Sequence, residues 1–283
     1  VHGDTHWSLF ATAYGLQLQR RFFDHFLKGM ANGWNRQPPV MLNVRHADGH
    51  FERRDEHEWP LARTQWMKYY LDADNGTLAA GSPPQAAQAR YATMGRGLAF
   101  RTAPLAHETE ITGPIAARLF IESATTDADL FLVVQVFDPQ GRELTFQGAL
   151  DPNTPIALGW LRASHRRVDP GRSKPWQPFH PHDAAEALIP GRVVEVDVEI
   201  LPTSIVLPAG WSLGLQVRGK DYEYEGEVAD FGRNFHYASR GTGGMTHNEP
   251  RNRPADVFDT TVTLHTGGHT ASYLLLPLVP PRS

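Results

Sequence analysis

The chain has 283 residues, of which 41% are hydrophobic and 20% are charged, and its formal net charge is −4. These proportions are ordinary for a globular protein with a well-formed core, and they exclude a disordered chain. No basic excess exists to neutralise phosphates and no run of 18 apolar residues exists to cross a bilayer, so neither nucleic acid nor a membrane is an expected partner.

The opening of the chain predicts a strand end, a polar turn and an amphipathic helix. Residues 1–7 are the strand end and the polar turn that follows it, and they contain two histidines. From residue 9 to residue 28 apolar side chains recur at helical spacing in two adjacent rows. Ser8 is placed to cap this helix and Gly29 to end it. The rows contain Leu18, Phe22 and Phe26, and Leu16, Phe23 and Leu27. A helix with so wide an aromatic face needs a further layer against it.

The next segment predicts the boundary between two domains. A loop at 30–39 contains Gly33 and two prolines, and a strand follows at 40–45. Residues 46–58 are strongly charged and have no strand or helix periodicity, so no element is expected there. We place the boundary after this charged stretch, at a Trp-Pro-Leu sequence. The predicted domains are residues 1–58 and 59–283.

From residue 65 onward the sequence predicts almost only β structure. The run 129–137 is apolar nearly throughout and should be buried on both faces, whereas 194–200 alternates aliphatic residues with carboxylates like a half-exposed antiparallel strand. Residues 138–141 predict a turn and 142–147 the second arm of a hairpin. Other expected strands are 66–71, 116–122, 213–217 and 272–276, with a surface loop at 81–88. Many short strands with Gly/Pro turns indicate a β-sandwich or jelly roll.

A series of short motifs carries a family resemblance, in order, over nearly the whole chain. The motifs are His6, residues 19–29 (QRRFFDHFLKG), 54–61 (RDEHEWPL), 112–114 (TGP), 207–210 (LPAG) and 272–277 (SYLLLP). With them the chain resembles the C-terminal portion of the cocaine esterase-like (CocE/NonD) acyl hydrolases, which include Xaa-Pro dipeptidyl peptidases and α-amino acid ester hydrolases. The resemblance implies that residues 1–58 are the last strand, turn and helix of an α/β-hydrolase domain. It also implies that the rest is a galactose-binding-like jelly-roll sandwich.

The same resemblance implies a role in a serine hydrolase of ester or amide bonds, with acyl or Xaa-Pro peptide groups as substrates. His6 would be the triad histidine, which takes the proton of the nucleophile and returns it to the leaving group. The nucleophilic serine and the acidic member would lie upstream of Val1, in the catalytic portion of the same protein. The sandwich would pack on that portion and help to wall the acyl pocket. No cofactor is implied.

Other residues near these motifs are alternatives or additions to this site. His2 lies four residues before His6 and could be the catalytic histidine instead, or a packed residue at a strand end. Trp7 is expected to pack beneath the turn or to line the acyl pocket. His247 follows a glycine-rich loop and is a further candidate for contact with the substrate.

Two local patterns suggest chemistry that the surrounding sequence does not support. Residues 210–214 match the G-x-S-x-G nucleophile elbow, but that motif needs a helix after the serine, and strand alternation follows Ser212. Histidine pairs at 180/182 and 265/269, and the acidic residues 221, 223, 225 and 227, could gather around a metal. None of them has a recognised ligand spacing, so no metal site is expected.

A second class of function is a carbohydrate-binding-like jelly-roll module, in which some of the seven tryptophans form a stacking platform. The aromatic helix at the start argues against this alternative, since a freestanding module has no use for it. That face indicates instead that the chain needs a partner, either the upstream portion of its own enzyme or a second copy in a homo-oligomer. The chain has no cysteine, which excludes disulfides but leaves the compartment open. We expect a soluble protein and slightly favour the cytoplasm.

Overall fold

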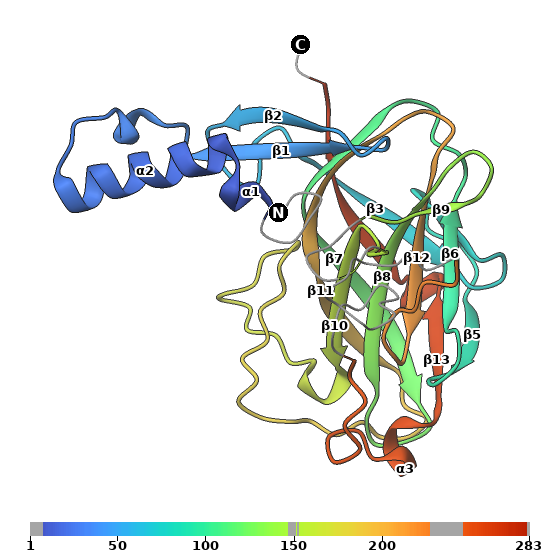
Figure 1. The fold of residues 1–283 in the computed structure, drawn as a ribbon. Helices are drawn as coiled ribbons and strands as arrows, with labels where there is room; N and C mark the ends of the chain where they lie inside the picture. Colours follow the sequence, from blue (N-terminus) through green and yellow to red (C-terminus); the bar gives the residue numbers. More distant parts are fainter. Residues whose placement is uncertain (1–7, 147–150, 152, 227–245, 282–283) are drawn as a thin grey trace.

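The computed structural model describes residues 8–146, 151, 153–226 and 246–281, and it is mainly β (Figure 1). The α-helices are α1 (Ser8–Ala11), α2 (Ala13–Lys28) and α3 (Ala255–Phe258). The strands of the N-terminal half are β1 (Val40–His46), β2 (Phe51–Glu56), β3 (Gln65–Asp72), β4 (Thr77–Ala79), β5 (Ala87–Ala92), β6 (Leu98–Thr102), β7 (Thr109–Ser123) and β8 (Asp129–Phe137). Those that follow are β9 (Glu143–Leu144), β10 (Ala157–Arg162), β11 (Val194–Leu207), β12 (Ser212–Arg218), β13 (Thr261–Thr266) and β14 (Tyr273–Val279).

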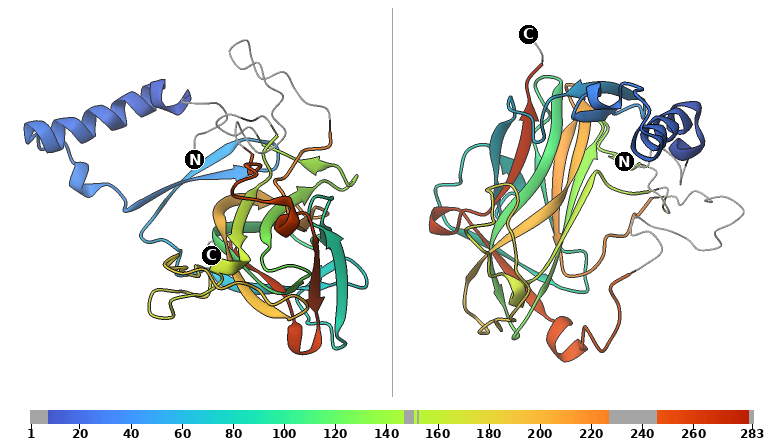
Figure 2. Two further views of the ribbon diagram at one scale, coloured as in Figure 1. Left: turned by 90° about the horizontal axis from the view of Figure 1, so that it is seen from below. Right: turned by 90° about the vertical axis from the view of Figure 1, so that its left-hand side faces the viewer.

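Nine of these strands close into a barrel-like sheet. Their order is β11, β10, β8, β12, β6, β4, β3, β14 and β7, and antiparallel pairing of β7 with β11 completes the ring. β13 and β5 extend the sheet from β7, and β1 and β2 extend it from β11. The two views of Figure 2 show the strands wrapped around one interior. The prediction of a mainly β fold is confirmed, and the jelly-roll description stays a prediction.

The interior is filled by the inward-facing side chains of the long strands. Alternate residues of each strand point to opposite faces, so one set from β7, β8, β11 and β12 meets in the centre. Fully buried members of this core are Leu119, Ile121, Leu130, Leu132, Ile200, Leu213 and Leu215. The predictions of a doubly buried strand at 129–137 and an alternating strand from residue 194 are confirmed by the burial of β8 and β11.

The N-terminal helix is interrupted, which corrects its predicted start. Thr12 has an extended backbone (ψ 158°), and its hydroxyl accepts a hydrogen bond of 3.1 Å from the amide of Gly15. Thr12 therefore caps the long helix α2, whereas Ser8 is the first residue of the separate short helix α1. The predicted end is confirmed: Gly29 has a φ of 65°, and its amide donates to the carbonyl of His25. Among the described residues no helix is long and apolar enough to cross a membrane.

A hairpin follows α2, where the sequence predicted only its first strand. The strand expected at 40–45 is β1, but the charged stretch after it contains β2, which pairs with β1 from Val40↔Glu56 to Arg45↔Phe51. Most of β2 is half-buried or exposed, so its side chains show no apolar alternation and the strand was missed. The carboxylate of Glu110 on β7 accepts hydrogen bonds of 2.5 and 2.7 Å from Arg54 and so fixes the hairpin to the barrel.

Candidate functional site

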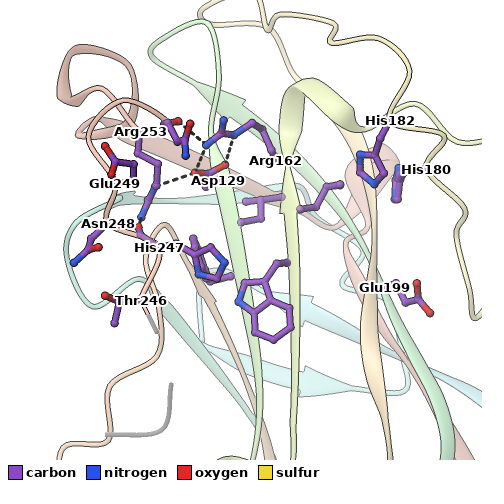
Figure 3. A pocket seen from close by; sticks show the side chains of 15 residues that line it. Asp129, Arg162, His180, His182, Glu199, Thr246, His247, Asn248, Glu249 and Arg253 are labelled. Carbon is purple, nitrogen blue, oxygen red and sulfur yellow. Dashed lines mark hydrogen bonds and ion pairs between the residues drawn. The ribbon is translucent and has the colours of Figure 1, made fainter. Parts of the chain in front are cut away.

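A cavity of about 500 Å³ lies on the outer face of β8 and β10 (Figure 3). Its floor comes from outward positions that pair across these strands, Phe131 with Trp160 and Asp129 with Arg162. The segment 246–253 forms one side of the cavity, and His180 and His182 lie at the other side. Trp160 is 42% exposed, so the floor presents an aromatic surface to solvent.

A buried ionic cluster ties this segment to the barrel. The carboxylate of Asp129 accepts two hydrogen bonds from Arg162, at 2.8 and 3.0 Å, and this pairing raises the pKa of the Arg162 guanidinium. Arg253 Nε lies 2.9 Å from the same carboxylate, close enough for an ion pair although its N–H is not aligned for a hydrogen bond. Arg162 also donates to the carbonyl of Asn252, and Arg253 to that of Gly219. One carboxylate therefore holds two guanidinium groups.

His247 lines the cavity, and one of its ring nitrogens is held by a carboxylate. Its backbone amide and its Nδ1 both contact the carboxylate of Asp221, at 2.6 and 2.8 Å. The ring packs edge-on against Phe131, 5.4 Å between centroids, and lies 6.4 Å from Trp160. In the tautomer whose Nδ1 donates to Asp221, Nε2 can accept a hydrogen bond from a ligand. This arrangement can orient a polar group of a small ligand over the tryptophan.

Most of the other predicted site residues are not placed by the structure. His2, His6, Trp7 and the glycine-rich loop at 241–244 lie outside the described residues. Ser212 is 7% exposed, and it is the first residue of strand β12 rather than the start of a helix. The prediction that residues 210–214 are not a nucleophile elbow is therefore confirmed.

The polar clusters that could have bound a metal have other partners. The ring nitrogens of His180 lie 3.1 and 2.9 Å from the carbonyls of Arg167 and Asp197, and His265 lies 3.5 Å from Glu122. Each of three acidic residues pairs with a different basic side chain: Asp221 with His247, Glu223 with Lys220, and Glu225 with Arg96. Within the described ranges no group of three His, Asp or Glu side chains could hold a metal ion.

Sequence reasoning missed the ionic cluster on the cavity floor. One signal for it was present: Asp129 begins a strand that was expected to be buried on both faces, and a buried carboxylate requires a positively charged or hydrogen-bonding partner. The sequence does not identify Arg162 and Arg253 as those partners, because both are distant along the chain and come together only through the pairing of β8 with β10 and the return of the segment 246–253.

Comparison with known proteins shows that this chain is similar to part of several hydrolases and esterases. Residues 32–275 match the family described as the X-Pro dipeptidyl-peptidase C-terminal non-catalytic domain. A Mycobacterium bovis protein named as a serine esterase is 28% identical over 71% of this chain and 35% of its own length. The cocaine esterase of a Rhodococcus species is 24% identical over 95% of this chain and 47% of its own length.

A solved structure agrees with these relatives. The CocE/NonD family hydrolase SACOL2612 from Staphylococcus aureus superposes with a TM-score of 0.80 and 27% identity, over 96% of this chain and 47% of that chain. The chain thus spans about half, or less, of the length of the proteins that it matches. It belongs to the X-Pro dipeptidyl-peptidase C-terminal non-catalytic domain family, and it corresponds to the C-terminal portion of a CocE/NonD-like hydrolase.

Proposed function

We propose that this chain is the C-terminal part of a serine hydrolase that cleaves ester or amide bonds of acyl or Xaa-Pro peptide substrates. The observation that supports the proposal is a match of nearly the whole chain to two proteins, one named cocaine esterase and one named CocE/NonD family hydrolase. In each case the match covers about half of the length of that protein. In this proposal residues 1–58 complete an upstream α/β-hydrolase domain, and the remainder is a jelly-roll domain that packs on it. The upstream portion supplies the nucleophilic serine and the acidic triad member.

Within this enzyme His6 is the general base and acid of the triad. His2 remains the alternative for that role. The β domain helps to wall the acyl pocket, with Trp7 and His247 as the contacts to substrate that we propose from this chain. The position of His247 beside an exposed tryptophan supports such a role, because the pair offers both an aromatic surface and a polar atom.

The exposed face of α2 supports the proposed partner. Phe23, Phe26 and Leu27 are 50%, 58% and 75% exposed, and in α2 the buried residues are Gly15 and Asp24. Figure 1 shows α2 projecting away from the barrel beside the hairpin of β1 and β2. Large apolar faces of this kind mark interaction surfaces in well-folded proteins. We assign this face to the upstream portion of the same protein, and a homo-oligomer would cover it with a second copy.

The carbohydrate-binding alternative is not favoured, because the matched family and relatives are hydrolases. Three of the tryptophans also pack against other aromatic side chains of the described chain. Trp66 and Trp176 stack on each other, 4.5 Å between centroids, and Trp34 packs edge-on against Phe22. These side chains therefore do not form a joint platform for a sugar.

The 283-residue chain is expected to show no turnover of a p-nitrophenyl ester, whereas a longer polypeptide that includes the upstream portion is expected to hydrolyse it. The reason is that neither the nucleophile nor its acidic partner lies in these residues under the proposal. Absorbance of released nitrophenolate measures both samples, and a fluorophosphonate label identifies the reactive serine. Activity of the chain alone that Ser212→Ala abolishes would overturn the proposal.

Polar substitutions on the exposed apolar face of α2 should show whether this face serves as an interface or is needed for folding. Phe23→Ser combined with Leu27→Ser is expected to leave the Tm of the 283-residue chain within about 2 °C and to lower the activity of the longer polypeptide by about tenfold or more. Gln17→Ser is the matched control, because Gln17 is exposed on the same helix and lacks an apolar side chain. Light scattering gives the molar mass of the 283-residue chain in solution and so tests whether a second copy covers this face in a homo-oligomer. Equal activity in the double variant and the control would contradict this interface.

A further inference from the structure

A second cavity, of about 570 Å³, lies on the outer face of β6 and β12, and no part of the proposed hydrolase site accounts for it. Two small residues of the β6 region, Gly97 and Ala99, leave its floor open. Ala99 pairs with Gln216 on β12, and Gly97 lies against the backbone of Arg218 so closely that a Cβ atom would approach the Val217 carbonyl to 2.3 Å. The cavity is therefore built into the sheet, and a side chain at Gly97 would disturb it.

Two arginines line this cavity without a carboxylate partner. Arg218 is 5% exposed, and its Nη1 donates to the side-chain oxygen of Gln216 at 2.9 Å. Arg101 makes a long contact of 3.4 Å to the carbonyl of Gly141. The Nε atoms of both arginines are buried and have no hydrogen-bond acceptor. Among the described residues neither guanidinium lies within 4 Å of an acidic side chain.

These arginines are only partly compensated by their surroundings. The Arg101 guanidinium lies 3.5 Å from the centroid of the Phe137 ring, and that of Arg218 lies 5.9 Å from the ring of Tyr222. Such contacts stabilise the cation but satisfy none of its N–H donors. Burial lowers the pKa of both guanidinium groups. A guanidinium that is partly or wholly buried without a nearby carboxylate is costly, so a ligand that brings negative charge and acceptor oxygens beside these groups would lower that cost.

The acidic residues at the cavity are already engaged. The carboxylate of Glu143 accepts a hydrogen bond of 2.7 Å from the hydroxyl of Tyr222, and burial raises the pKa of Glu143. Glu223 lies 3.7 Å from Lys220, and Glu225 lies 3.3 Å from Arg96. Arg101 and Arg218 are therefore the two cations of the lining that have no ion-pair partner within 4 Å among the described residues.

We propose that this cavity binds a small oxyanion, a carboxylate or a phosphate, between Arg101 and Arg218. Arg101 pairs with Gly214, four residues before Arg218, so the two arginines enter from either end of a stretch of β12 about 13 Å long. Gln216 lies midway and presents its amide beside the guanidinium of Arg218. Planar N–H groups of arginine match the oxygen atoms of carboxylate and phosphate, and they bind such groups more strongly than neutral donors do. This proposal does not depend on the hydrolase activity.

The test is calorimetric titration of the 283-residue chain, in Tris chloride buffer, with inorganic phosphate and separately with benzoate. We expect saturable binding of at least one probe, and the probe that binds distinguishes a phosphate ligand from a carboxylate ligand. Arg218→Gln and Arg101→Gln should each weaken the Kd of that probe by about tenfold or more. Arg101→Gln keeps the test valid if the buried Arg218 proves necessary for folding.

Arg96→Gln is the matched control, since Arg96 lines the same cavity but is 85% exposed and pairs with Glu225. It removes the same charge and should leave the Kd within about twofold, because an exposed charge is screened by solvent. Absence of saturable binding of both probes would overturn the proposal. An unchanged Kd in Arg101→Gln, or an equal loss in Arg96→Gln, would also overturn it, because binding would then reflect general positive charge.

Discussion

Replacement of His6 by alanine in the longer polypeptide is expected to lower kcat for a p-nitrophenyl ester by on the order of 10⁴- to 10⁶-fold. Without this histidine the nucleophilic serine keeps its proton, and the leaving group receives none. Because the loss concerns a step of the reaction and not substrate affinity, KM should change by less than about threefold. Steady-state kinetics of the purified variant measure both quantities.

The control for this prediction is the neighbouring histidine. His2→Ala carries the same substitution four residues away and should keep kcat within about tenfold of the parent, since a residue outside the triad affects the site only through packing. A large loss in His2→Ala with nearly full activity in His6→Ala would assign the catalytic role to His2. Substantial activity in both variants would contradict a triad histidine in this chain.

Much of the barrel could be predicted from sequence because its inner strands carry a strong signal. The strand β8 was placed at its observed bounds, Asp129–Phe137, since a continuous apolar run that ends at a Pro/Gly turn has few alternatives. The strands β2, β4, β5, β6, β10 and β13 were missed. β5 mixes alanine with Gln and Arg, so its composition resembles that of a surface loop although it pairs with β13 along its whole length.

The candidate site was harder to predict, for a physical reason. Its groups come from strands and segments that are distant along the chain, and closure of the sheet brings them together. His247 was proposed from its glycine-rich surroundings, but Asp221, which contacts its ring, was considered only as one member of an acidic run without a recognised ligand spacing. A local pattern gives residue types and spacing, whereas the partner of a charged side chain is decided by long-range pairing.

Asp129→Asn is expected to lower the free energy of unfolding of the 283-residue chain by about 3–5 kcal/mol. The side chains of Asp129 and Arg253 are only 10% and 9% exposed, so the variant leaves a buried guanidinium without its counter-charge. Arg162 is 33% exposed and can turn toward solvent, and the largest cost should therefore come from Arg253. Urea unfolding followed by tryptophan fluorescence measures the change.

An exposed pair and a double variant test the cause of this loss. Glu249→Gln removes the carboxylate that contacts Arg251, in a pair whose side chains are 48% and 89% exposed, and it should cost less than about 1 kcal/mol. Combining Asp129→Asn with Arg253→Met removes the unpaired charge, so the double variant should be more stable than Asp129→Asn alone. A single-variant loss below about 1 kcal/mol would show that the cluster does not hold the segment 246–253 to the barrel. A double variant no more stable than Asp129→Asn would show that the cost does not arise from a stranded Arg253 charge.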